Sequence, residues 1–379
     1  MKLTALFLTI FIWKLSQLML VIVNPYDYYD LNDSVLIFLV AEVFLIPFFA
    51  ITSYKLKDVH VYKTEPRSSL KFLKKFYIIP AILFFIIMIY FKITLNVGFQ
   101  ELRNLFFFGA DFFISFSSLN YLIFIYTALG YLLLFSGIVF KDREAVYIAL
   151  FAMFLFDVAQ GGRMFLFYAL LLIVSAYFTL KESSTLFKFK RDKVIYLVFT
   201  SYLAIAFISL ITVSRISDGN SSFAEFLYLY FVGPVYLFSE TIKASDFAIA
   251  VDGRVGISFM SLDWAITGVA KLFFDGFETL NTIVDPILST GYYFHDEYGM
   301  NAAFTSNLYL FSEFSYIGTI FFPVLIIGVS RLKIPFARFL MFLLVFSYFI
   351  SIREHFLNTP IFLIALLAYP FFIKRVKYT

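Results

Sequence analysis

Three consecutive residues near the end of the chain, Arg353, Glu354 and His355, bring together a cation, a carboxylate and a titratable ring. They form a short turn between two apolar runs, 339–352 and 356–373. A guanidinium group binds phosphate, and a carboxylate or an imidazole can accept a proton. We therefore expect catalysis or substrate contact at this turn. An exposed turn without chemistry is the alternative.

A second turn, at 160–163, combines Gly161 and Gly162 with Arg163. Glycines allow backbone amides to approach an anion closely, and the arginine adds a positive charge. The pattern predicts a phosphate-binding site. The competing interpretation is a buried ion pair between Arg163 and Asp157.

Three further residues are weaker candidates. Arg215 directly follows an apolar run and could bind phosphate or simply reach the headgroups. Arg103 lies in the amphipathic segment 96–118, which could also rest on the membrane surface. His295, within an aromatic and acidic stretch, could act as a base or stack on a sugar, or it could be an ordinary loop residue.

The elements that must position these residues are apolar. Hydrophobic residues make up 61% of the 379 residues, and the mean hydropathy is +0.88. Such runs predict an all-α polytopic membrane protein with about ten transmembrane helices. The expected runs are 4–23, 34–53, 76–95, 119–140, 145–159, 163–180, 194–213, 306–330, 339–352 and 356–373.

The charges between the runs set the expected orientation. If both termini are cytoplasmic, most of the 30 Lys and Arg residues lie inside and most of the 26 Asp and Glu residues lie outside. Five arginines remain on the acidic outer side, which suggests an anionic ligand such as a lipid phosphate. Lys14, midway along the first run, needs a partner, and Glu42 on the second run is the expected one.

The lengths of the segments divide the chain into three parts. A seven-span bundle (1–213) is followed by a long outer loop (214–305) and a three-span bundle (306–379). Within the loop, 223–242 is expected to be re-entrant or interfacial, because Gly233 and Pro234 interrupt it. A 14-residue helix rises only about 21 Å against a hydrocarbon core of about 30 Å. The tips at Arg163 and Arg353 should therefore be drawn inward, to the depth of a lipid-linked phosphate.

Several kinds of chemistry are not expected. The chain has no cysteine, its three histidines lack metal-site spacing, and no Gly-rich phosphate loop is present. We expect no metal, no cofactor and no nucleic-acid partner.

Three local patterns carry a family resemblance: Gly161-Gly162-Arg163 opening a short apolar helix, Arg215 followed by the aromatic segment 228–234, and Asn301-Ala302-Ala303-Phe304-Thr305 leading into 308–318. In that last segment Glu313-Phe314-Ser315 and Gly318 replace the family's Asp-Phe-Gly-like turn. With ten runs and one long outer loop, the chain resembles the Wzy-type O-antigen or capsule polymerases.

The resemblance implies a glycosyltransferase at the periplasmic face of the bacterial inner membrane. Its substrates would be undecaprenyl-diphosphate-linked oligosaccharides held in membrane lipid, with a chain-length regulator and a flippase as partners. Arg163, Arg215, Arg353 and Arg103, with Gly161 and Gly162, would bind substrate, and Glu354, His355 or His295 would be the general base. The alternatives are an O-antigen ligase and, in a different class, a lipid-linked oligosaccharide flippase or other transporter.

Overall fold

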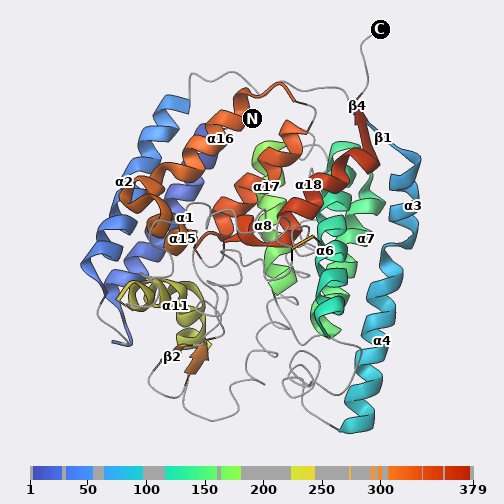
Figure 1. The fold of residues 1–379 in the computed structure, drawn as a ribbon, viewed down its shortest axis with the longest axis horizontal. Helices are drawn as coiled ribbons and strands as arrows, with labels where there is room; N and C mark the ends of the chain where they lie inside the picture. The colour runs from blue at the N-terminus through green and yellow to red at the C-terminus, as the bar shows by residue number, and fades with distance from the viewer. Residues whose placement is uncertain are drawn as a thin grey trace, which may run out of the picture. The chain divides into compact units, whose positions relative to one another are not determined.

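The structure is a computed structural model that is nearly all helical (Figure 1). It describes residues 3–27, 31–53, 64–96, 116–159, 164–180, 223–243, 273–274, 292–294, 298–300, 306–334, 336–352 and 355–375. The chain forms two compact units, each assembled from distant segments. The first unit comprises 1–60, 224–333 and 343–363, and the second comprises 61–223, 334–342 and 364–379.

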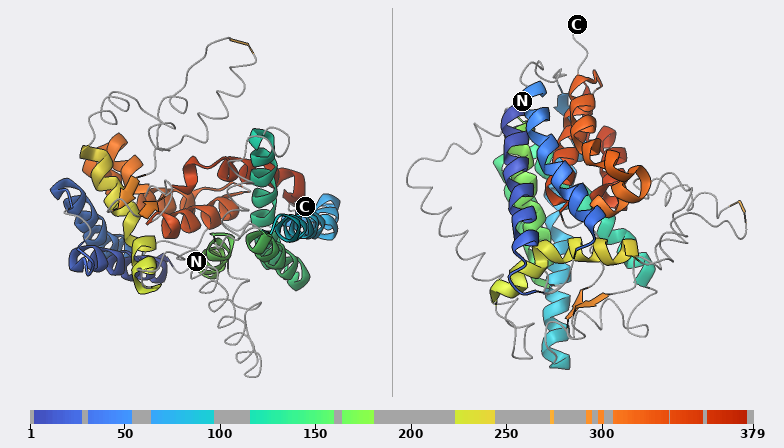
Figure 2. Two further views of the ribbon diagram at one scale, coloured as in Figure 1. Left: turned by 90° about the horizontal axis from the view of Figure 1, so that it is seen from below. Right: turned by 90° about the vertical axis from the view of Figure 1, so that its left-hand side faces the viewer.

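The first unit begins with a helical hairpin, α1 (Leu3–Val23) and α2 (Asp33–Ser53). The chain turns between them through Asn24 and Asp27, which both have positive φ. Asn32 then accepts a hydrogen bond from the Ser34 amide at 2.9 Å, which caps the start of α2. The short connection explains why the two helices lie side by side (Figure 2).

Helix α11 (Phe223–Lys243) lies across the α1–α2 turn in both views (Figures 1 and 2). The Ser239 hydroxyl accepts a hydrogen bond from the Asn32 amide at 2.8 Å, and the Tyr228 hydroxyl donates to Asn24 Oδ1 at 3.1 Å. The segment expected to be re-entrant or interfacial is therefore a helix docked on one end of this hairpin. Its relation to a membrane stays a prediction.

The expected run 306–330 is not one continuous helix. It consists of α15 (Ser306–Phe314), a 3₁₀ segment η2 (Ser315–Ile320) and α16 (Phe321–Arg331). Ser315 adopts φ 51°, and Gly318 packs so closely that a Cβ there would lie 2.5 Å from the Leu310 carbonyl oxygen. The chain thus folds η2 back against α15.

The second unit contains α3 (Ser68–Phe76), α4 (Ile78–Leu95), α6 (Phe116–Val139), α7 (Arg143–Ala159) and α8 (Met164–Thr179). Strand β1 (Thr64–Pro66) pairs antiparallel with β4 (Ile373–Arg375), so the segment before α3 and the end of the last helix lie side by side. In the first unit, β2 (Tyr292–Phe294) pairs with β3 (Tyr298–Met300).

Helices α17 (Ala337–Ile350) and α18 (Pro360–Phe372) form a hairpin around the short 3₁₀ turn η3 (Phe356–Asn358). Five described stretches are long and apolar enough to cross a membrane: Leu3–Val23, Asp33–Ser53, Ser68–Leu95, Leu122–Val139 and Ser306–Arg331. Phe167–Thr179, α17 and α18 are apolar but shorter. These helices indicate a membrane protein; the expected run 194–213 lies outside the described residues, and the count of ten stays a prediction.

Candidate functional site

A buried ion pair joins the middles of α1 and α2 in the first unit. Lys14 Nζ lies 2.9 Å from Glu42 Oε1 and 3.1 Å from Oε2, and the two residues are only 2% and 3% exposed. This confirms the partner expected from the sequence. Charged side chains in such apolar surroundings are costly unless they are paired, and they are commonly functional.

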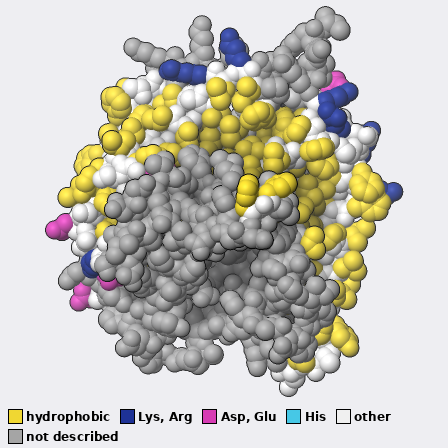
Figure 3. Space-filling view, in the orientation of Figure 1, with side chains coloured by type: hydrophobic (Ala, Val, Ile, Leu, Met, Phe, Trp, Pro, Cys, Tyr) yellow, Lys and Arg dark blue, Asp and Glu magenta, His cyan; other side chains and the backbone are white. Residues whose placement is uncertain are grey.

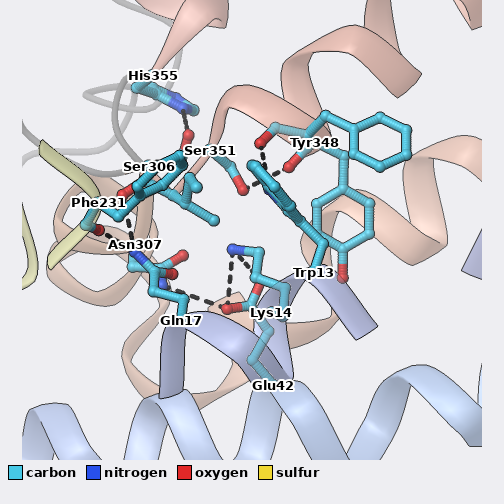
Figure 4. A network of polar contacts seen from close by, with 12 residues as sticks. Trp13, Lys14, Gln17, Glu42, Phe231, Ser306, Asn307, Tyr348, Ser351 and His355 are labelled. Carbon is cyan, nitrogen blue, oxygen red and sulfur yellow. Dashed lines mark hydrogen bonds and ion pairs between the residues drawn. The ribbon is translucent and has the colours of Figure 1, made fainter. Parts of the chain in front are cut away.

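Glu42 also holds the start of α15. Asn307 Nδ2 donates to Glu42 Oε2 at 3.2 Å, and the Ser306 amide donates to the Ser351 carbonyl at 3.0 Å (Figure 4). The first amides of a helix have no partner within the helix itself. The Ser351 carbonyl supplies one for the Ser306 amide, at a point where both residues are fully buried.

The end of α17 lies against the same part of α1 that carries Lys14. Trp13 Nε1 on α1 donates to the Phe349 carbonyl at 3.0 Å, and Gln17 Nε2 donates to the Ile352 carbonyl at 3.1 Å. Gln17 also donates to the Phe231 carbonyl of α11 at 2.9 Å. Side chains of α1 therefore donate to three backbone carbonyls, of which that of Phe349 lies in the last turn of α17 and has no partner within the helix.

His355 lies directly above this junction (Figure 4). Its Nδ1 is 2.9 Å from the Ser306 hydroxyl, its ring stacks on Tyr309 at 5.0 Å, and the residue is 3% exposed. The hydroxyl can donate to a basic Nδ1 or accept from a protonated one. In either case it fixes the orientation of the imidazole ring.

Two aromatic residues, Tyr348 and Phe322, pack beside the ion pair. Lys14 Nζ lies 5.6 Å from the centre of the Tyr348 ring, and Phe322 stacks on that same ring at 5.0 Å between ring centres. The Tyr348 hydroxyl is fully buried, and no hydrogen-bond partner for it occurs among the residues that the structure describes. Such an atom commonly marks a bound water or ligand.

We call these seven polar residues the buried polar cluster: Lys14, Gln17, Glu42, Ser306, Asn307, Ser351 and His355. All seven lie in the first unit. They come from α1, α2, the start of α15 and the turn that follows α17. The cluster can hold a backbone turn rigidly inside apolar surroundings and can place one imidazole there.

Of the site residues predicted from the sequence, the structure describes only His355. The others lie outside the described residues: Glu354, His295, Arg163, Arg215, Arg353, Arg103, Gly161 and Gly162. Ile352 and His355 flank Arg353 and Glu354 in sequence, and they are 1% and 3% exposed. The described residues on either side of that pair are thus buried, and the membrane depth of Arg353 stays a prediction.

Four cluster residues were not singled out by sequence: Gln17, Ser306, Asn307 and Ser351. A signal exists for Gln17, which lies three residues after Lys14 and so shares its helix face. Within the described residues, no group of three or more His, Cys, Asp or Glu side chains could hold a metal ion.

Comparison of the chain with protein-family models, curated proteins and solved structures finds no match.

Proposed function

We propose that this protein is a membrane glycosyltransferase of the Wzy type, which polymerises undecaprenyl-diphosphate-linked oligosaccharide repeat units. The observation that carries the proposal is the end of α17, where the buried polar cluster holds the chain just before Arg353. In the sequence, Arg353 and Glu354 lie between Ile352 and His355, which are both buried, and the Ser306 hydroxyl lies 2.9 Å from His355 Nδ1. That arrangement suits a phosphate group attached to a lipid.

The proposed reaction needs few groups. The bond between the donor's reducing-end sugar and its diphosphate breaks, and the diphosphate leaves with the bonding electrons. A hydroxyl group of the second lipid-linked unit forms the new glycosidic bond and gives up its proton to a base. The donor is already activated, so no nucleotide is required.

Each candidate residue has a role in this scheme. Arg353 would stabilise the charge that grows on the diphosphate, with Arg163, Arg215 and Arg103 as further ligands and Gly161 and Gly162 supplying amides. His355 is the favoured base because the Ser306 hydroxyl orients its ring at 2.9 Å. Glu354 and His295 remain the other candidates.

The proposal also includes a membrane topology, a location and partners. Ten spans would place both termini in the cytoplasm and the site on the periplasmic face of the inner membrane. A docked helix α11 and the loop that follows it would cover the sugars. A chain-length regulator and a flippase would then be the partners.

A test uses the surface polysaccharide of a strain that lacks this gene. A polymerase predicts lipid A-core capped by one repeat unit, with a full ladder restored by the wild-type gene. Arg353→Ala should stay at one unit although it is produced normally. The matched control is Arg331→Ala, which removes an exposed arginine at the end of α16 and should restore the ladder. Bare core with accumulated lipid-linked polymer would indicate a ligase instead.

One observation favours a transporter as the second candidate. Transporters commonly combine broken helices with ionisable residues near the membrane midplane. The α15–η2–α16 break and the ion pair between the middles of α1 and α2 would fit this description if both lie at that depth. If the deletion abolishes both polymer and capped core, transport becomes the better account.

A further inference from the structure

A pocket of about 510 Å³ in the second unit lies between α3, the end of α6 and the start of α7. Its floor is apolar, formed by residues such as Leu70, Leu133 and Ile148. Its rim carries Lys71, Lys74 and Lys75. The volume falls within the range of pockets that hold small ligands.

The rim charges are not all neutralised. Lys74 pairs with Asp142 and Glu144, each at 2.7 Å. In the described part of the chain, neither Lys71 nor Lys75 forms an ion pair. The two are four residues apart on α3 and therefore lie on the same face. Two available cations beside an apolar floor match a ligand that is anionic at one end and apolar at the other.

The faces of α3 place this pocket at a lipid boundary. The rings of Phe72 and Phe76 contact each other at a tilt, with 4.5 Å between their centres, but the residues are 66% and 41% exposed, while Leu70 and Leu73 are buried. A helix with exposed aromatic residues beside lysines is typical of a segment lying in the membrane interface. After Tyr77 the chain continues directly into the apolar helix α4.

Basic side chains border an apolar surface near α3. Figure 3 shows Lys and Arg side chains beside an apolar surface, at the edge where Figure 1 places α3. On the expected topology this edge faces the cytoplasmic leaflet, whose surface is negative. Basic pockets between membrane helices on that side bind acidic headgroups.

We propose that the pocket binds the headgroup of an acidic phospholipid. The phosphate would lie between Lys71 and Lys75, and the acyl chains would run along the apolar side toward α4. This site is independent of the proposed polymerase activity and of the buried polar cluster.

The test is native mass spectrometry of the full chain in detergent, titrated with phosphatidylglycerol or phosphatidylcholine. We expect one phosphatidylglycerol to bind more tightly than phosphatidylcholine. Each lysine should contribute about fivefold, so Lys71→Gln/Lys75→Gln should weaken that first binding roughly 25-fold. The control Lys92→Gln/Lys243→Gln removes the same charge from the last turns of α4 and α11 and should change it less than twofold.

A variant that removes a negative charge should have the opposite effect on lipid binding. Glu144 is exposed, and its carboxylate offsets the positive charge of Lys74. The variant Glu144→Gln should therefore tighten binding of phosphatidylglycerol about fivefold. Equal affinity for the two lipids, or unchanged affinity in the double lysine variant, would overturn the proposal. Displacement of phosphatidylglycerol by millimolar inorganic phosphate would also overturn it, because it would identify an ion site without lipid.

Discussion

The two units each contain a lysine paired with carboxylates, but the surroundings of the two pairs differ. In the first unit, Lys14 and Glu42 are almost fully buried and share a network with two helix ends. In the second unit, Lys74 meets Asp142 and Glu144 where water still reaches all three. A lysine–carboxylate pair is thus buried, at a cost in desolvation free energy, in the first unit. In the second unit it is an ordinary, partly exposed ion pair.

The difference has an energetic consequence. Breaking a buried pair leaves an uncompensated charge and costs about 3–5 kcal/mol, whereas an exposed pair is worth about 0–1 kcal/mol. Buried ion pairs are weak contributors to net stability, so the Lys14–Glu42 pair needs another reason to exist. Positioning the ends of α15 and α17 is the reason that its hydrogen bonds suggest.

The largest expected effect comes from removing one charge of the buried pair. Lys14→Met should destabilise the protein by about 3–5 kcal/mol, because Glu42 is then left buried without its cation. Thermal unfolding in detergent measures this loss. Lys14→Met/Glu42→Gln should recover most of the stability, since the new amide oxygen can still accept from Asn307. Failure of the double variant to recover would show that the charges are not coupled.

The next effect concerns the break after α15. Gly318→Ala should destabilise the first unit by about 1–3 kcal/mol, because a Cβ would lie 2.5 Å from the Leu310 carbonyl oxygen. Gly328→Ala is the matched control on α16, where no atom lies within 4 Å of a Cβ. That variant should be neutral or slightly stabilising in the same unfolding assay. Equal behaviour of the two variants would contradict the described fold of η2.

A smaller effect is expected at the imidazole. Ser306→Ala removes the hydroxyl beside His355 Nδ1 and should cost about 1 kcal/mol of stability. Under the proposed function it should also lower polymer yield and shift the pH dependence of the reaction, because the ring loses its fixed orientation. Ser312→Ala, which removes only a hydroxyl bonded to its own helix, should leave the pH profile unchanged. An unchanged profile for both would exclude His355 as the oriented base.

The smallest effect belongs to the second unit. Burial raises the pKa of Asp142, but hydrogen bonds from Lys74 and from the Ala145 and Glu144 amides outweigh it, so the pKa lies below its usual range. The carboxylate therefore stabilises the fold above its unfolded pKa, near 4, and loses this contribution as the pH falls through the folded value. Asp142→Asn should lower stability by less than about 1 kcal/mol at pH 7 and by still less at pH 3. If Asp142→Asn lost more stability at pH 3 than at pH 7, the pKa of Asp142 would not be lowered in the folded protein.

The units also differ in how far the sequence predicts them. Helices such as α1 and α2 match the expected runs within about one residue, because charged or turn-forming residues mark their ends. Glu42 could be named as the partner of Lys14 because a charge in an apolar run needs one. The expected run 306–330 did not include the break at Ser315. The roles of Asn307 and Ser306 could not be predicted, because they depend on contacts with the distant residues Glu42 and Ser351. The expected run 76–95 corresponds to α4, and helix α3 before it was not predicted, because a nine-residue segment with three lysines is too short and too polar to be read as an apolar run.

The most direct measurement of the proposed activity uses purified protein in liposomes with undecaprenyl-diphosphate-linked repeat units and no nucleotide. We expect a ladder of polymer and release of undecaprenyl diphosphate. Arg353→Ala, with unchanged thermal unfolding, should lower the rate about 10²–10³-fold, as loss of a group that stabilises the transition state does. Arg331→Ala should match the wild type. If correctly folded wild-type protein makes no polymer, or if Arg353→Ala works as well as the wild type, the account is wrong.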